Sequence, residues 1–268
     1  MFKTRLNFAV TRWVVTTVAT ILTFPITIGS TTLPAKAGLC QSLSIPAYFF
    51  PGGSPNYWTE AIASAPQVDV MIMNPNSGPG GALDPSYVTA VANAQAVGIK
   101  VLGYVPTSYG NRAASLVKSD INLYRNWYKV DGIFFDETAS VANKISYYKS
   151  LAQYVRSGRG NFVMLNPGIF PDQGYMKIAD RVIVFENTYS AYVRSWTPPT
   201  WLYNYPAQRF VHLVHATSAA QLGNAVTLST QRNASSVFIT NDVLPNPWDT
   251  LPSYWNKALS TLKQKCSI

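Results

Sequence analysis

Eight apolar runs alternate with helix-like segments along this chain, and this alternation restricts the possible folds more than any other feature. Each run is apolar throughout instead of alternating with polar residues, which is typical of parallel strands buried on both faces. The predicted strands span residues 44–51, 68–75, 99–106, 130–137, 161–168, 181–188, 209–216 and 236–242. The predicted helices that follow them span residues 57–65, 85–98, 113–128, 141–158, 174–179, 190–196, 219–233 and 253–264.

Eight strand–helix units in a single domain predict a closed (β/α)8 barrel, the TIM barrel of the α/β class. An open doubly wound sheet is the alternative fold for this alternation. Doubly wound folds that bind dinucleotides carry a GxGxxG loop after the first strand. The segment PGGSPNY at 51–57 lacks that spacing, so the barrel is favoured.

Residues 1–37 have the layout of a secretory signal peptide. Three basic residues precede an apolar segment at 13–29, and a small-x-small cleavage site, Ala-Lys-Ala, ends at Ala37. The barrel domain is therefore predicted to span residues 38–268, and the protein to be secreted to the extracellular space or the periplasm. No later run is long enough to span a bilayer, so no stable membrane insertion is expected after cleavage.

Two other interpretations of this N-terminal segment are weaker. A membrane anchor is disfavoured because the apolar segment is short for a span and contains several Thr residues and Pro25. A lipoprotein signal is disfavoured because Leu39, directly before Cys40, is large for that kind of cleavage motif.

The two cysteines, Cys40 and Cys266, lie at the two ends of the predicted secreted domain. In an exported protein such a pair is expected to form a disulfide that joins the chain ends. A metal site is the less favoured use, because His212 and His215 show no ligand spacing with the cysteines. No metal and no cofactor is therefore expected.

The charge of the chain argues against a nucleic-acid partner. With 21 Lys and Arg against 12 Asp and Glu, the formal net charge is +9, and without the four bases of the signal peptide it is 17 − 12 = +5. This surplus is scattered and forms no basic run interleaved with aromatic residues. Trp and Tyr are frequent, and their flat faces suit sugar rings, although core packing explains them equally well. We expect a monomer that binds an extracellular polysaccharide.

Acidic side chains are rare in this chain, yet two of its three glutamates stand at predicted strand ends. Asp136 and Glu137 end the fourth strand and Glu186 lies at the end of the sixth. In a (β/α)8 barrel the chemistry takes place at the C-terminal ends of the strands. Only one strand separates the fourth from the sixth, so these side chains are expected to face each other across the barrel mouth.

Two carboxyl groups across a cleft are the groups that hydrolyse a glycosidic bond. One donates a proton to the leaving oxygen, and the other is the nucleophile or the base that activates water. Repulsion between like charges separates their pKa values and gives each group its role. A separation of roughly 5–5.5 Å is typical of retaining enzymes and one of roughly 6.5–9.5 Å of inverting enzymes. The alternative is structural: the acids pair with Lys or Arg, and Glu186 caps the next helix.

Other polar residues near the strand ends are candidates for binding a sugar, although each is equally suited to stabilising a loop. These predicted substrate-binding residues are Tyr48, Asn74, Tyr104, Asn166, His215 and Asp242. Three tryptophans lie in predicted loops, Trp196, Trp201 and Trp248. Each is expected either to stack on a sugar or to pack in the core. A structural role, as helix caps or charged surface groups, is expected of Asp69, Asp84, Asp120 and Asp180.

Four motifs in a fixed order, MNPNSGPG at 73–80, VLGYVPTSYGNR at 101–112, VDGIFFDE at 130–137 and VFEN at 184–187, together resemble one family. These motifs resemble the spherulin-4-like (spherulation-specific) proteins, also classed as glycoside hydrolase family 135, and the resemblance extends over 45–242. It implies a (β/α)8 barrel. It also implies a secreted, endo-acting hydrolase that cleaves α-1,4-linked N-acetylgalactosamine in the galactosaminogalactan exopolysaccharide of mould biofilms.

The resemblance also implies a site, because the family's Asp-Glu pair and later Glu match Asp136, Glu137 and Glu186 of this chain. Our working hypothesis makes Asp136 the ionised nucleophile or cation stabiliser and Glu186 the general acid/base. Glu137 then positions the sugar or tunes its neighbour, and exchange of roles among the three stays open. The alternative functions are an enzyme acting on a different amino-sugar polymer and a polysaccharide-binding or cell-surface protein without turnover.

Overall fold

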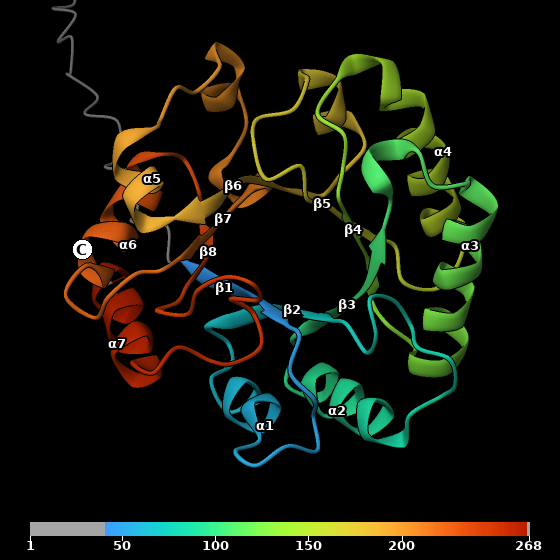
Figure 1. Cartoon of the computed structure of the whole chain (residues 1–268), viewed down its shortest axis with the longest axis horizontal. Helices are drawn as coiled ribbons and strands as arrows, with labels where there is room; N and C mark the ends of the chain where they lie inside the picture. Colours follow the sequence, from blue (N-terminus) through green and yellow to red (C-terminus); the bar gives the residue numbers. More distant parts are fainter. Residues whose placement is uncertain (1–40, 267–268) are drawn as a thin grey trace, which may run out of the picture. The chain divides into compact units, whose positions relative to one another are not determined.

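The computed structural model describes residues 41–266 of the 268-residue chain. Eight parallel strands close into one barrel in the order of the sequence, and the helices lie around its outside (Figure 1). The predicted (β/α)8 barrel is confirmed. The strands are β1 (Ser42–Ala47), β2 (Val68–Met73), β3 (Lys100–Pro106), β4 (Gly132–Asp136), β5 (Phe162–Leu165), β6 (Arg181–Thr188), β7 (Phe210–His215) and β8 (Ser236–Ile239).

Seven α-helices follow these strands. They are α1 (Tyr57–Ile62), α2 (Pro85–Ala96), α3 (Ala114–Leu123), α4 (Ile145–Arg156), α5 (Tyr189–Arg194), α6 (Leu222–Gln231) and α7 (Trp255–Cys266). A π-helical turn, η2 (Tyr124–Tyr128), extends α3. The short 3-10 helices are η1 (Ser108–Gly110), η3 (Ala142–Lys144), η4 (Gln173–Lys177), η5 (Thr200–Asn204) and η6 (Ala207–Arg209).

The connection between β5 and β6 is the one that contains no α-helix. The helix predicted at 174–179 is instead the 3-10 helix η4, and the Asp172 carboxylate caps it by accepting a hydrogen bond from the Gly174 N–H at 2.8 Å. Pro167 and Pro171 stand in the first half of this connection. Each proline disfavours helical backbone in the residue before it. Only a short turn remains before β6 begins.

The observed strand ends place the acidic residues at one edge of the barrel. β4 ends on Asp136 and pairs with β5, which in turn pairs with β6, the strand that contains Glu186. β1 ends at Ala47, earlier than predicted, so Tyr48 follows it directly. β8 ends at Ile239, and Asp242 therefore lies in the loop beyond the strand.

An ion pair spans the interior of the barrel at the opposite, N-terminal end of the strands. The Arg181 guanidinium, at the start of β6, contacts the Asp69 carboxylate of β2 at 2.5 Å and donates to Ser44 Oγ at 3.1 Å. β2 and β6 are four strands apart in the ring, so this pair joins opposite walls. The other predicted structural aspartates are a helix cap and two ion-pair partners, Asp84, Asp120 and Asp180.

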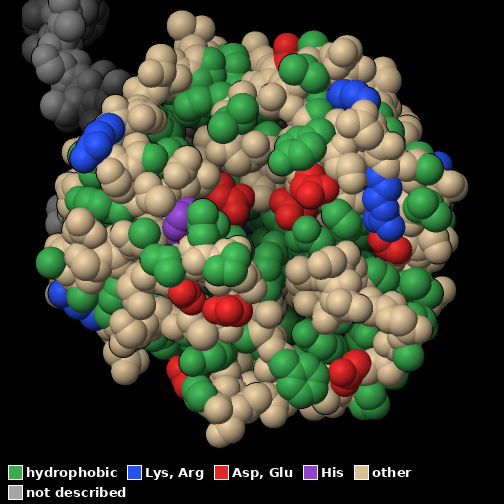
Figure 2. Space-filling model, viewed as in Figure 1, with side chains coloured by type: hydrophobic (Ala, Val, Ile, Leu, Met, Phe, Trp, Pro, Cys, Tyr) green, Lys and Arg blue, Asp and Glu red, His purple; other side chains and the backbone are tan. Residues whose placement is uncertain are grey.

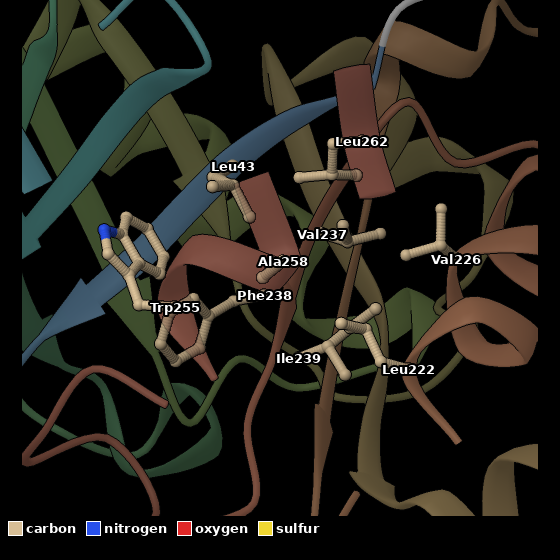
Figure 3. Close-up of a pocket in the computed structure, with 9 residues that line it drawn as sticks. All are labelled: Leu43, Leu222, Val226, Val237, Phe238, Ile239, Trp255, Ala258 and Leu262. Carbon is tan, nitrogen blue, oxygen red and sulfur yellow. The ribbon is translucent and has the colours of Figure 1, made fainter. Parts of the chain in front are cut away.

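A small apolar gap lies outside the barrel wall, between β8 and the helices α6 and α7 (Figure 3). It is lined by hydrocarbon and aromatic side chains, among them Leu222, Phe238 and Trp255. No polar side chain lines this gap, so it offers no chemistry. It belongs to the packing of the two helices against the strands.

Predictions that concern the chain ends fall outside the described residues. The signal peptide at 1–37 and Cys40 lie there, so cleavage and the disulfide between Cys40 and Cys266 stay predictions. Within residues 41–266, no helix combines the length and the hydropathy that a membrane crossing requires.

Gly103 in β3 leaves room for the ring of Tyr124, and this contact predicts the effect of a substitution. A Cβ atom on Gly103 would meet Tyr124 Cγ at 2.5 Å, and Tyr124 is fully buried. Gly103→Ala is therefore expected to lower the free energy of unfolding by about 2 kcal/mol, measured by urea denaturation.

Gly223→Ala is the matched control for this prediction. Gly223 lies in α6, and no atom lies within 4 Å of the position its Cβ would take. Alanine there is expected to raise the free energy of unfolding by about 0.5–1 kcal/mol, because glycine disfavours a helix. Equal effects of the two substitutions would contradict the packing of Tyr124 against β3.

Candidate active site

One amide group connects the two carboxyl groups at the mouth of the barrel. Asn166, directly after β5, donates from Nδ2 to Asp136 Oδ1 at 2.8 Å and to Glu186 Oε2 at 2.6 Å. Two oxygens bonded to the same nitrogen lie no farther apart than the sum of these two lengths. The carboxyl oxygens are therefore as close as the roughly 5–5.5 Å separation of retaining glycosidases.

The orientation of the Asn166 amide is fixed by its neighbours. Its Oδ1 accepts a hydrogen bond from the Gly168 N–H at 3.0 Å, so Nδ2 must face the carboxyl groups. Its backbone N–H donates to Phe135 O at 2.9 Å, and its backbone carbonyl accepts from the Thr138 N–H at 3.0 Å. The bridging amide is thus held by both its side chain and its backbone.

Glu186 has the environment of a proton donor. Burial raises its pKa from 4.5 to about 7, and the charge of Asp136 acts in the same direction. Hydrogen bonds from Asn166 Nδ2 and from Trp248 Nε1, the latter to Oε1 at 3.2 Å, partly oppose that rise. A carboxyl group with a pKa near 7 holds its proton in a large part of the molecules at neutral pH, as a general acid requires.

Asp136 is half-buried and accepts more hydrogen bonds than Glu186 does. Burial raises its pKa, while hydrogen bonds from the Tyr104 hydroxyl, the Glu137 backbone and Asn166 lower it. These three donors favour the ionised form. Burial is the largest effect, so the pKa of Asp136 is raised overall, and the three donors limit this rise.

Glu137 stands in a strained turn. Its φ is +49°, in the left-handed region, and its Oε2 accepts from the Ser108 N–H at 3.0 Å. Its backbone carbonyl accepts from the Tyr109 N–H at 2.7 Å and from Thr107 Oγ1 at 2.9 Å. Thr107 is in turn hydrogen-bonded to the Tyr148 hydroxyl at 2.8 Å. Such backbone outliers persist only where surrounding contacts fix them, and they concentrate at functional sites.

Two hollows meet at the carboxyl pair and together form a cleft. The first, of about 660 Å³, is lined by Tyr109, Asp136, Glu137, Asn166, Pro167, Gly168, Ile169 and Glu186. The second, of about 870 Å³, is lined by Tyr48, Asn74, Ser77, Asp136, Glu186, His215 and the segment 244–248. Figure 2 shows the depression on this face of the molecule, with acidic side chains at its centre. Asp136 and Glu186 line both hollows, so the carboxyl pair stands where the two hollows meet.

The structure brings together most of the predicted sugar-binding residues. Tyr48, Asn74 and His215 line the second hollow, and Tyr104 bonds Asp136. Asp242 lines neither hollow: its carboxylate accepts from Thr250 Oγ1 at 3.1 Å and so holds its own loop. The predicted substrate contact of Asp242 stays without geometric support.

The three candidate tryptophans differ in their surroundings. Trp196 and Trp201 both contact Phe170, at centroid distances of 5.1 and 6.3 Å, and pack against the core. Trp248 is buried and reaches the cleft, where it donates to Glu186. It also meets the His215 ring edge to face at 6.0 Å.

Tyr109 and Ile169 are among the cleft residues that the sequence analysis did not predict. Tyr109 and Ile169 are both 60% exposed and line the first hollow. Tyr109 lies three residues beyond β3, and the SYG motif around it is the signal that marks a turn at this strand end.

Among the described residues, no group of three or more His, Cys, Asp or Glu side chains has the arrangement of a metal site.

The closed parallel barrel and its opposed carboxyl groups define the class of carbohydrate-active (β/α)8 barrels. The chain belongs to spherulation-specific family 4, whose family model matches residues 42–262. Spherulin-4 of Physarum polycephalum is 32% identical over 235 residues, which are 82% of this chain and 69% of that protein. The family indicated by the sequence motifs is thereby confirmed.

Solved structures agree with this assignment. The crystal structure of Aspergillus clavatus Sph3 in complex with GalNAc has a TM-score of 0.73 and 26% identity, and the match covers 84% of this chain and 98% of that chain. A chitinase of Chromobacterium violaceum has a TM-score of 0.55 and 10% identity, over 84% and 99% of the two chains. The similarity to the chitinase shows only that the two chains share a fold.

The raised pKa of Glu186 predicts a pH-dependent loss of stability. The group binds its proton more tightly in the folded chain, where the pKa is about 7, than in the unfolded chain, at 4.5. Its contribution to stability therefore decreases as the pH rises from about 4.5 to 7. Above pH 7, Glu186→Gln is expected to be more stable than the wild type by roughly 1–3 kcal/mol in urea denaturation.

Glu60→Gln makes the same change on the exposed helix α1 and serves as the control. Its stability is expected to follow the wild-type pH profile. A Glu186→Gln variant whose stability runs parallel to the wild type from pH 4 to 8 would contradict the raised pKa.

Proposed function

We propose that this protein is a secreted, endo-acting glycoside hydrolase that cleaves α-1,4-linked N-acetylgalactosamine units of an exopolysaccharide. The observation that carries the proposal is the pair of half-buried carboxyl groups bridged by Asn166 between two hollows. Membership of spherulation-specific family 4 and the similarity to Sph3, which was solved with GalNAc, support the sugar class. The predicted signal peptide at 1–37 supports export.

The first step forms a covalent bond between the sugar and the protein. The Asp136 carboxylate attacks the anomeric carbon, and Glu186 transfers its proton to the leaving glycosidic oxygen as that C–O bond breaks. The leaving chain departs with this proton, and Glu186 becomes ionised. The products of the step are a glycosyl ester of Asp136 and a shortened polysaccharide.

The second step releases the sugar. Ionised Glu186 takes a proton from water, whose oxygen attacks the anomeric carbon, and the bond to Asp136 breaks. Both carboxyl groups return to their starting forms. The short separation enforced by Asn166 leaves no room for a water between the two groups, so the anomeric configuration is retained.

Glu137 and Trp248 are assigned supporting roles. Glu137 lines the first hollow and is held by the Ser108 N–H, which suits a group that positions the sugar. Trp248 donates to Glu186 and closes one wall of the second hollow. A protein that binds polysaccharide without turnover gains nothing from burying two adjacent acids, because burial of a carboxyl group costs stability.

Separate amide substitutions test the proposed roles. Asp136→Asn and Glu186→Gln are each expected to lower kcat on N-acetylgalactosamine polymer by about 1,000-fold or more, and Glu137→Gln by about 10- to 100-fold. Release of reducing ends and mass spectrometry of the products measure the rates.

Glu60→Gln again provides the matched control, since it removes a charge far from the cleft, and it is expected to keep the wild-type rate. Circular dichroism confirms that each variant is folded. Wild-type rates from all three folded cleft variants would rule out the proposed hydrolysis, as would a wild type that binds the polymer but never shortens it.

Asn166→Ala tests the bridging amide through the pH profile. Asn166 lowers the pKa of both Asp136 and Glu186, so its removal raises both values. Both limbs of the kcat profile are expected to move to higher pH, and the maximal rate to fall by about 100-fold. Asn224→Ala on the surface of α6 is the control. If the Asn166→Ala variant is slower but the limbs of its kcat–pH profile do not move, Asn166 has only a structural role.

A further inference from the structure

Among the side chains that the structure describes, the three most exposed large apolar ones all line the cleft. Leu244 is 69% exposed and lines the second hollow, and Tyr109 and Ile169 are each 60% exposed and line the first. Figure 2 shows hydrophobic side chains beside the acidic ones in the central depression. Apolar surface in water gives up the free energy that burial would provide, so its concentration in one cleft marks a surface that a ligand covers.

Tyr109 and Ile169 stand on either side of the strand that ends in the acids. Tyr109 follows β3 and Ile169 follows β5, and both of these strands pair with β4, which ends at Asp136. Glu137 and Asn166 line the same hollow. The first hollow therefore combines two exposed apolar side chains with carboxyl and amide groups.

Backbone hydrogen bonds fix the turn that presents Tyr109. The Tyr109 N–H donates to Glu137 O at 2.7 Å, and the Gly110 N–H donates to Thr107 O at 3.0 Å. Ser108 and Tyr109 have φ values of +49° and +53°, in the left-handed region that bulky residues rarely adopt. Such strain concentrates at functional sites. Since the turn leaves the Tyr109 ring exposed, its conformation serves the cleft and not the packing of the core.

The turn before Ile169 is bonded to the residues that form the carboxyl pair and its bridge. The Gly168 N–H donates to Asn166 Oδ1 at 3.0 Å, and the Glu186 N–H donates to Gly168 O at 3.0 Å. Both apolar side chains of the first hollow thus extend from turns that are hydrogen-bonded to residues of the acid site.

A pyranose ring fits this combination of groups. One face of the ring consists of C–H groups, which pack on an aromatic side chain, and the hydroxyl groups at its edge donate hydrogen bonds to carboxylates. In the first hollow Tyr109 supplies the flat apolar surface and Glu137 supplies a carboxylate.

We propose that Tyr109 is the stacking residue of the first hollow: its ring packs on the apolar face of one pyranose unit of the polymer, and Ile169 contacts the same unit. This inference rests on the proposed function, because it assigns to the first hollow a unit next to the bond that is cleaved. The aromatic ring of Tyr109, and not its hydroxyl group, provides the attraction.

Binding to the Glu186→Gln chain tests this assignment without requiring hydrolysis. The probe is a soluble oligosaccharide of α-1,4-linked N-acetylgalactosamine that is long enough to fill both hollows, and isothermal titration calorimetry of the full chain measures its Kd. Tyr109→Leu, added to this chain, keeps an apolar side chain but removes the flat ring, and it is expected to raise the Kd about tenfold. Tyr109→Phe retains the ring and is expected to keep the Kd within about twofold.

Tyr203→Leu is the matched control for the loss of a tyrosine ring. Tyr203 is 57% exposed in η5 and lines neither hollow, so the same change there is expected to leave the Kd unaltered. Circular dichroism confirms that each variant is folded.

An unaltered Kd in Tyr109→Leu, an equal loss of affinity in Tyr109→Leu and Tyr109→Phe, or no binding of the oligosaccharide by the Glu186→Gln chain would each overturn the proposal. A wild type that never shortens the polymer, although its binding depends on the Tyr109 ring, would count against the proposed hydrolysis alone. Cleavage by the wild type together with binding that is independent of Tyr109 would count against this inference alone.

Discussion

The proposed chemistry of this cleft depends on one shared amide, because Asn166 bridges two half-buried carboxyl groups. The closed barrel makes this possible: β4, β5 and β6 are neighbours, so a residue after the middle strand reaches the acids on both sides. In the proposed mechanism the short separation leads to retention of configuration, and burial with a nearby charge gives Glu186 a pKa of about 7. The strand order and this contact thus set the positions of the two groups, and burial sets the protonation of Glu186.

The same arrangement costs stability, which distinguishes a catalytic site from packing. A buried carboxyl group with a raised pKa destabilises the fold as the pH rises, and Glu137, Ser108 and Tyr109 all adopt positive φ values. Hydrogen bonds from Thr107 and the Tyr109 N–H hold this turn in place. Barrel closure, including the ion pair between Arg181 and Asp69 at the far end, supplies the rigid frame that such strain requires.

The sequence predicted the fold well because continuous apolar runs and their regular alternation with helices are properties of the chain itself. It also placed Asp136 and Glu186 on two strands separated by one other, since strand order in a barrel follows chain order. The bridging by Asn166, the reach of Trp248 into the cleft and the exposure of Tyr109 depend on side-chain and loop conformations that no periodicity encodes.

The protonation of Glu186 is the central claim, and the sequence makes it directly measurable. Only three glutamates occur in the chain, so protein labelled with carboxyl-¹³C glutamate gives three side-chain carboxyl signals, and Glu186→Gln identifies one of them. NMR titration is expected to give Glu186 a midpoint of about 7, which falls when Asp136→Asn removes the neighbouring charge. A midpoint near 4.5 that does not respond to Asp136→Asn would contradict this account of the site.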